Sequence, residues 1–181
     1  DTRSGYRVLT LREDLDTLSI QLRAVKLMLV VDKQKAREMF SDIPEIKVKT
    51  LSCDEAVGYD IYEFYKVLKE IVENTFNGEA QQRREPLYFA SAYLEGISSH
   101  AQVDPAVEFL KSVKATPQEF DVLLNGFISG LRKVRLDPLG FRMAMGNFVS
   151  SGIKTLSTVK TKPKSAQSNE LLRAYRNYLI K

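Results

Sequence analysis

The sequence is short of the residue types that most metal sites need. Its 181 residues include one cysteine, one histidine and no tryptophan. A single cysteine permits no intrachain disulfide, which excludes the small disulfide-stabilised scaffolds. Zinc sites want several cysteine or histidine ligands, and a carboxylate-bridged di-iron bundle wants two Glu-x-x-His pairs. We therefore expect no metal site and no cofactor.

Catalytic motifs are equally scarce. Cys53 and His100 could in principle form a cysteine hydrolase centre, but no local signature supports the pairing. A lone cysteine is more often a small buried hydrophobe, and a histidine at a helix end satisfies terminal carbonyls. The glycines form no phosphate-binding loop of the Gly-x-Gly-x-x-Gly type. No catalytic residue is predicted, and an enzyme that uses Tyr, Glu and Asp groups is the third alternative for function.

Long apolar runs are absent as well. The longest stretch, Leu27 to Val31, falls far short of the roughly 18 to 20 apolar residues that a membrane span requires. We expect a soluble chain without a transmembrane segment. Because the sequence begins at Asp1 rather than Met, a cytoplasmic protein and the mature form of an exported one both remain open.

Helix signals are what the sequence has in abundance. Capping residues, proline at first-turn positions and apolar residues at steps of three and four recur along the chain. Asp32, Pro86, Asp104-Pro105 and the Thr116–Glu119 capping box each mark a helix start. The pattern predicts helices over about 11–31, 60–76, 86–98, 105–114, 117–135, 138–157 and 167–180. After Asp32 it also predicts a helix that contains Ala36, Met39 and Phe40.

Two segments between these helices are predicted to be irregular. Residues 44–51 alternate apolar and basic side chains but have no partner strand, so we interpret them as an extended connector. Residues 79–85 are polar and charged and are predicted to form a loop after a helix that ends at Asn77-Gly78. Inside the helix at 117–135, Gly126 and Gly130 predict a notch where another helix crosses.

These features indicate an all-α fold of about eight helices without a sheet. Asp32 to Phe40 resembles the second half of a tetratricopeptide-type hairpin, but no second copy follows at a fixed period. An irregular multi-helix bundle or a short stack of α-hairpins therefore fits better than a regular solenoid. We expect one helical domain over residues 1–181, in which 165–181 form a C-terminal helix after a basic linker at 160–164.

Charge is distributed unevenly along the chain. Residues 1–110 carry 14 basic and 19 acidic side chains, and residues 111–181 carry 13 and 4, so a net charge of −5 is followed by one of +9. Such polarity either steers an acidic partner toward one end or balances two halves of one fold. The basic residues proposed to bind a partner are Arg132, Lys133, Arg135, Lys154, Lys160, Lys162 and Lys164.

Two tyrosines complete the predicted partner-binding set. By helical spacing, Tyr59 and Tyr62 point away from the Ile61–Leu68 face, so they serve either packing against another helix or a partner. The first hypothesis for function is a non-catalytic interaction or structural module whose partner is an acidic protein or a membrane surface. The alternative is sequence-nonspecific nucleic-acid binding through the basic half. The sequence does not indicate an oligomeric state.

Overall fold

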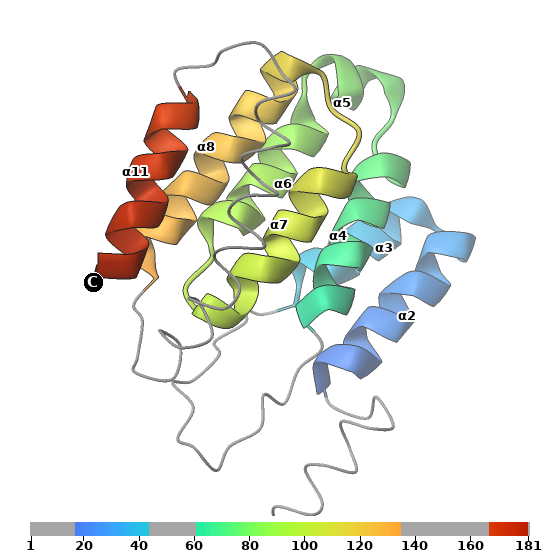
Figure 1. Cartoon of the computed structure of the whole chain (residues 1–181). Coiled ribbons are helices and arrows are strands. Elements are labelled where there is room, and N and C mark those ends of the chain that lie inside the picture. Colours follow the sequence, from blue (N-terminus) through green and yellow to red (C-terminus); the bar gives the residue numbers. More distant parts are fainter. Residues whose placement is uncertain (1–16, 44–60, 135–166, 181) are drawn as a thin grey trace, which may run out of the picture. The chain divides into compact units, whose positions relative to one another are not determined.

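The structure, a computed structural model, describes residues 17–43, 61–134 and 167–180. These residues form eight α-helices and one short 3-10 helix, and no strand occurs among them. The all-α fold predicted from the sequence is confirmed, as an irregular arrangement of helices rather than a regular repeat (Figure 1). The chain divides into two compact units, Asp1–Arg83 and Arg84–Lys181, which are described in turn.

The first unit is built on three helices that contact one another. They are α2 (Thr17–Val31), α3 (Lys33–Ser41) and α4 (Ile61–Asn74), each packed against the other two. Helical spacing predicts three apolar stripes here: Leu11, Leu15, Leu18, Leu22, Val25 and Leu29; Ala36, Met39 and Phe40; and Ile61, Phe64, Tyr65, Leu68, Val72 and Phe76. Leu11 and Leu15 lie outside the described residues, and all the others are buried except Leu29 and Met39, which are partly exposed. In the core that the three helices share, the rings of Phe40 and Phe64 stack with centroids 5.0 Å apart. Helix α4 has a broad apolar face because both α2 and α3 pack on it.

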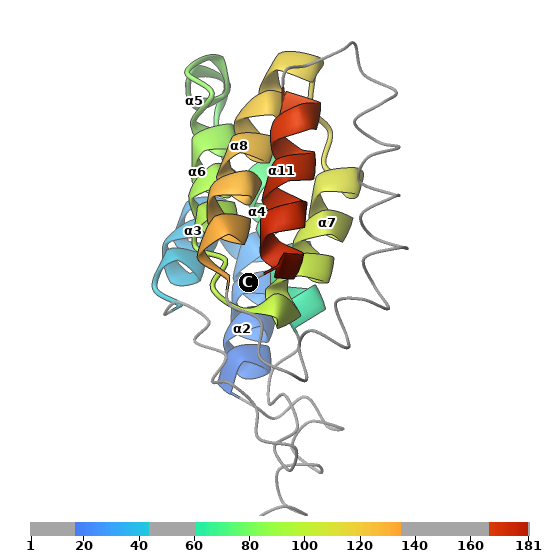
Figure 2. The same cartoon turned by 60° about the vertical axis from the view of Figure 1, so that its left-hand side comes forward.

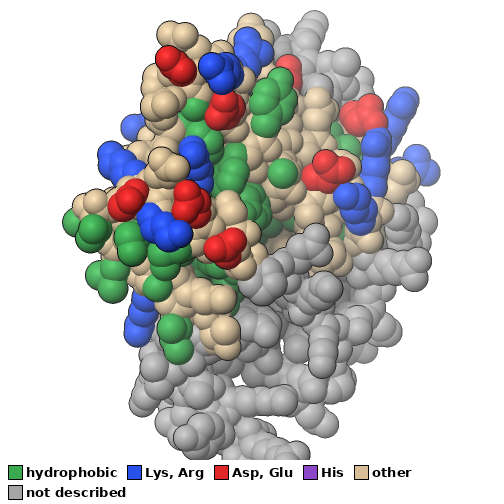
Figure 3. Space-filling view, turned by 180° about the vertical axis from the view of Figure 1, so that it is seen from behind, with side chains coloured by type: hydrophobic (Ala, Val, Ile, Leu, Met, Phe, Trp, Pro, Cys, Tyr) green, Lys and Arg blue, Asp and Glu red, His purple; other side chains and the backbone are tan. Residues whose placement is uncertain are grey.

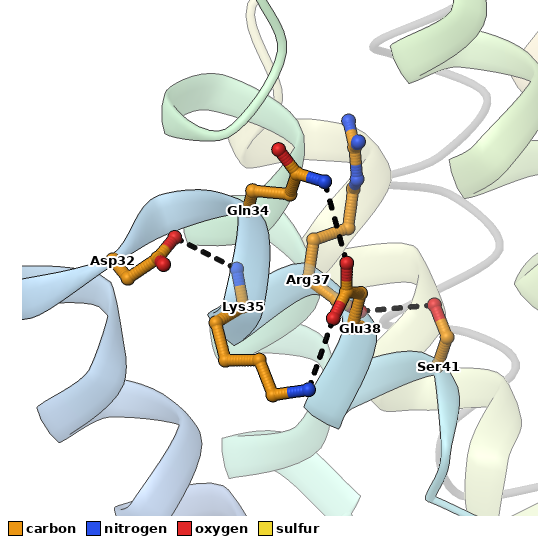
Figure 4. Close-up of polar contacts among 6 residues, drawn as sticks. All are labelled: Asp32, Gln34, Lys35, Arg37, Glu38 and Ser41. Carbon is orange, nitrogen blue, oxygen red and sulfur yellow. Dashed lines mark hydrogen bonds and ion pairs between the residues drawn. The ribbon is translucent and has the colours of Figure 1, made fainter.

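The sharp corner between α2 and α3 follows from Asp32. Its side chain accepts a hydrogen bond from the Lys35 N–H at 2.9 Å, as expected of a helix cap (Figure 4). Only this residue, in extended backbone, separates the two helices. The predicted second helix therefore begins where the sequence placed it.

The prediction for residues 79–85 was wrong, because a short helix, α5 (Gly78–Gln82), lies there. Asn77 does not end the preceding helix, which stops at Asn74. Instead, the Asn77 side chain caps α5 by accepting the Ala80 N–H at 2.8 Å. An Asn-Gly pair can stand at either end of a helix. Because α5 is short and has one buried residue, Ala80, its sequence shows no periodic pattern of apolar residues.

The second unit is organised around α8 (Pro117–Lys133). Three helices pack on it: α6 (Glu85–Glu95), α7 (Val103–Ser112) and α11 (Gln167–Ile180). Figures 1 and 2 both show α11 lying alongside α8. The face of α8 predicted from the sequence is buried throughout, at Phe120, Leu123, Leu124, Phe127, Leu131 and Val134. The predicted capping box is present, since the Thr116 side chain accepts the Glu119 N–H and the Glu119 carboxylate accepts the Thr116 N–H at 2.7 Å.

The predicted glycine notch lies where α6 crosses α8. A Cβ added to Gly126 would approach the Ser91 carbonyl oxygen to 2.6 Å, and one added to Gly130 would approach the Leu94 carbonyl oxygen to 2.2 Å. Ser91 Oγ also donates to the Val122 carbonyl oxygen at 3.3 Å across this contact. The two glycines therefore let the backbones of α6 and α8 approach more closely than any side chain would allow.

Helix starts in this unit differ from prediction at two places. Asp104 is not the cap of α7, because that helix begins at Val103, directly after the 3-10 helix η1 (His100–Gln102). Asp104 and Pro105 both lie in the first turn, where an acidic side chain is favoured and a missing N–H costs nothing. In α6, Pro86 occupies the second helical position rather than the first.

Leu172 corrects the predicted face of the last helix. Leu171, Tyr175 and Tyr178 of α11 are buried as expected, but Leu172 is 47% exposed and Ala174 takes its place in the core. The described residues include none of the predicted connector at 44–51 and none of the predicted helix at 138–157.

Candidate interaction surface

Helix α2 is apolar on two opposite sides. Its inner side, Leu18, Leu22 and Val25, is buried against α3 and α4. Its other side leaves Ile20 51%, Leu27 73%, Val30 87% and Val31 81% exposed. We call these four residues the outer face of α2. Seven large apolar side chains are exposed among the described residues, and these four are the majority of them. Apolar exposure is therefore concentrated on one helix.

The helical period explains why the four residues form one surface. At 100° per residue, Ile20, Leu27, Val30 and Val31 fall within an arc of roughly 100°, centred opposite the buried stripe. Figure 3 shows hydrophobic side chains, in green, gathered at the left margin of this view. A helix that is apolar all round is normally buried all round, so the outer face of α2 calls for an explanation.

Basic residues outnumber acidic ones in the hairpin that carries this face. The α2–α3 hairpin, Thr17–Ser41, contains five basic and two acidic residues, and α2 itself contains no acid. Both acids of the hairpin are engaged. Asp32 caps α3, and Glu38 accepts from Lys35 Nζ at 3.1 Å and from Gln34 Nε2 at 3.4 Å (Figure 4). Positive charge therefore dominates the hairpin.

One ion pair ties α2 to α4. Lys26 Nζ donates to Glu63 Oε1 at 2.8 Å, and Lys66 Nζ lies 3.4 Å from the second oxygen of the same carboxylate. The hydrogen bond from Lys26 is the main reason that the pKa of Glu63 lies below its ordinary value of 4.5. The same bond raises the pKa of Lys26 above 10.5. Lys33, by contrast, is exposed and forms no ion pair within the described parts of the chain.

Tyr62 of the predicted partner-binding set lies on α4 and is 48% exposed, whereas its neighbour Ile61 is buried. It therefore points away from the core face, as helical spacing predicted. Tyr59 lies outside the described residues. The role of both tyrosines in binding stays a prediction.

Arg132 and Lys133 of the predicted basic set lie in the last turn of α8 and are roughly half exposed. Arg132 forms an ion pair with Glu170 of α11. Lys133 Nζ donates to the Glu95 carbonyl oxygen at 3.1 Å and lies 3.4 Å from its carboxylate. Both cations thus join helices of the second unit.

The other predicted basic residues, Arg135, Lys154, Lys160, Lys162 and Lys164, lie outside the described residues. Of the two members that are described, Lys133 pairs with Glu95, an acid of the acidic part at 1–110, and Arg132 pairs with Glu170 of the basic part. Binding of a partner by the whole set remains a prediction.

The residues considered for chemistry are not assembled into a site by the described part of the structure. Cys53 lies outside it, and His100 begins η1. Within residues 17–43, 61–134 and 167–180, no group of three or more His, Cys, Asp or Glu side chains is placed to hold a metal ion. Every helix in the same ranges falls short of the length and hydrophobicity needed to cross a bilayer.

Comparison with known proteins gives no relative from which a role could be carried over. No family model matches the chain, and neither a curated protein nor a solved structure matches it. The geometry of the outer face of α2 therefore has to be interpreted on physical grounds.

Proposed function

We propose that this protein is a non-catalytic interaction module that binds its partner through the outer face of α2. The observation that supports the proposal is the exposure of four large apolar side chains on one helix face. Leaving such groups in water costs roughly 1.5 to 3 kcal/mol for each fully exposed side chain, relative to burial.

Two further features favour this face over the basic end of α8. Among the described residues of the first unit, the opposite side of α2 makes the packing contacts with α3 and α4, and the outer face stays exposed. Arg132 and Lys133, in contrast, are engaged by Glu170 and Glu95. Burying exposed apolar groups against a partner contributes more binding free energy than a new contact to cations that already form ion pairs.

Site-specific photocrosslinking in the cells that produce the protein tests the proposal. A benzophenone amino acid would replace Leu27 on the outer face, and in a matched control it would replace Asn125, which is exposed on α8. We expect discrete protein or lipid adducts from position 27 and none of comparable yield from position 125. Equal and diffuse labelling at both positions would contradict the proposal.

A further inference from the structure

We propose that the outer face of α2 binds the surface of an anionic lipid bilayer, with Leu27, Val30 and Val31 inserted among the lipid chains. This inference rests on the proposed function and names the partner of the same surface. It assigns peripheral attachment, with α2 lying along the membrane surface and not crossing it.

The shape of the surface suits a bilayer. Exposure increases along α2 from Ile20, at 51%, to Val30 and Val31, at 87% and 81%, next to the corner made by Asp32. The most exposed apolar groups therefore lie at a projecting helix end. An apolar helix face of this kind enters the boundary between headgroups and acyl chains to a depth of roughly 5 to 10 Å.

The size of the surface argues against a second copy of this chain. Fifteen residues of helix extend about 22 Å, and a helix is about 10 Å wide, so its footprint is on the order of 220 Å². Stable protein interfaces bury about 800 Å² on each partner. A bilayer has no such threshold, because each methylene transferred into it adds to the affinity.

The charge of the hairpin is complementary to anionic lipid. Lys33 is exposed and follows the corner directly. The nearby acids Glu63 and Glu38 are held by Lys26 and Lys35, and the Asp32 carboxylate accepts from the backbone of α3. Phosphate and carboxylate headgroups would thus meet the positive charge of Lys33 close to the exposed side chains of Val30 and Val31.

Vesicle flotation with the full chain tests the inference. The probes are vesicles of phosphatidylcholine alone and of phosphatidylcholine mixed with phosphatidylserine. One variant combines Leu27→Ser, Val30→Ser and Val31→Ser, and its matched control combines Tyr88→Ser and Leu172→Ser, two exposed apolar positions of the second unit. A charge variant, Lys33→Gln, is matched by Lys114→Gln, since both lysines are exposed.

We expect the wild-type chain to float with the vesicles that contain phosphatidylserine and much less with phosphatidylcholine alone. The triple serine variant should lose partitioning by a factor on the order of one hundred, because three apolar groups no longer enter the bilayer. Lys33→Gln should lose about fivefold, and that loss should disappear at high salt. Both controls should float as the wild type does, and all variants should keep their helical circular dichroism.

Three outcomes would overturn the inference. One is the absence of flotation, and another is an equal loss in the triple variant and its control. The third is a dimer in analytical ultracentrifugation that the triple variant abolishes, which would assign the face to a second copy. If position 27 gives protein adducts without flotation, the interaction module stands and the membrane surface is wrong; if it gives no adducts and no flotation occurs, both proposals fail.

Discussion

At the scale of single residues, Gly126 and Gly130 decide how closely two helices approach. The atoms that a Cβ would meet include main-chain carbonyl oxygens of α6, which cannot rotate out of the way as the end of a flexible side chain can. Glycine weakens a helix by roughly 1 kcal/mol relative to alanine. The close packing of α6 on α8 therefore offsets the loss of helix stability that the two glycines cause in α8.

Replacing Gly130 with alanine should destabilise the protein. The new methyl group would lie 2.2 Å from the Leu94 carbonyl oxygen, so the helices must separate, and we expect a net loss of about 2 kcal/mol after the gain in helix propensity. Urea denaturation measures the change. Gly78→Ala is the matched control, because no atom lies within 4 Å of its added Cβ, and its stability should stay within about 1 kcal/mol of wild type. Unchanged stability of Gly130→Ala would mean that the crossing is looser than described.

Arg84 has an unusual backbone conformation. It precedes α6 with φ 59° and ψ 23°, the left-handed region, which costs a side chain other than glycine roughly 1 to 2 kcal/mol. Arg84→Gly should therefore raise the midpoint of thermal unfolding, by an amount worth up to about 1 kcal/mol. Arg83→Gly should lower it, because Arg83 has φ −78° and gains nothing from glycine. A loss of stability in both variants would contradict this assignment of strain.

At the scale of elements, α2 is held to its neighbours by one side only. Buried leucine and valine side chains provide most of the attachment, and the Lys26–Glu63 ion pair adds a polar tie to α4. Lys26 is 45% exposed, so the pair contributes no more than about 1 kcal/mol. The outer face can therefore be altered without loosening the helix.

The contribution of this ion pair should depend on pH in a defined way. The pKa of Glu63 is lowered in the folded state, so its stabilisation is present above the ordinary value of 4.5 and is lost as pH falls through the folded value. The pKa of Lys26 is raised, so its share is complete below 10.5 and is lost as pH rises beyond that. Glu63→Gln should thus destabilise the protein near neutral pH, by up to about 1 kcal/mol.

Urea denaturation of Glu63→Gln and wild type across the acid range measures this effect. The difference between them should shrink toward zero as pH falls through the lowered pKa of Glu63, because the wild-type carboxylate then becomes protonated as well. Glu73→Gln, an exposed position on the same helix, serves as the control. A difference that stays constant from neutral to acid pH would show that the pair does not contribute.

At the scale of the whole molecule, the buried apolar side chains of the described residues belong to two compact units. Each unit has its own buried set, around Phe40 and Leu68 in the first and around Leu124 and Phe127 in the second. The single domain over residues 1–181 stays a prediction. With one cysteine and one histidine, the chain has few of the ligands that a structural metal would use.

Removal of metal should therefore leave the protein folded. After dialysis against EDTA we expect the helical circular dichroism signal and the unfolding temperature to be unchanged. Metal analysis before dialysis provides the reference. Zinc or iron present in a one-to-one ratio, with helicity lost on its removal, would contradict the expectation.

Much of the fold could be predicted from the sequence, because capping and helical periodicity act over a few residues. The Thr116–Glu119 box, the Asp32 cap and the buried faces of α4 and α8 all follow from local spacing. The predictions failed where local signals are ambiguous. Asn77 caps a following helix instead of ending one, and α7 starts before Asp104 because η1 leads directly into it.

The candidate surface could not be predicted in the same way. The run Leu27 to Val31 was visible as the longest apolar stretch, but five consecutive apolar residues surround a helix on every side. By itself, the sequence predicted an amphipathic helix with one stripe through Leu11, Leu15, Leu18, Leu22, Val25 and Leu29, of which the structure buries Leu18, Leu22 and Val25 and leaves Leu29 partly exposed. Only the tertiary structure decided that the stripe faces α3 and α4 while Leu27, Val30 and Val31 stay uncovered. The burial of a helix face depends on which distant segments pack against it. The spacing of residues along the helix does not contain that information.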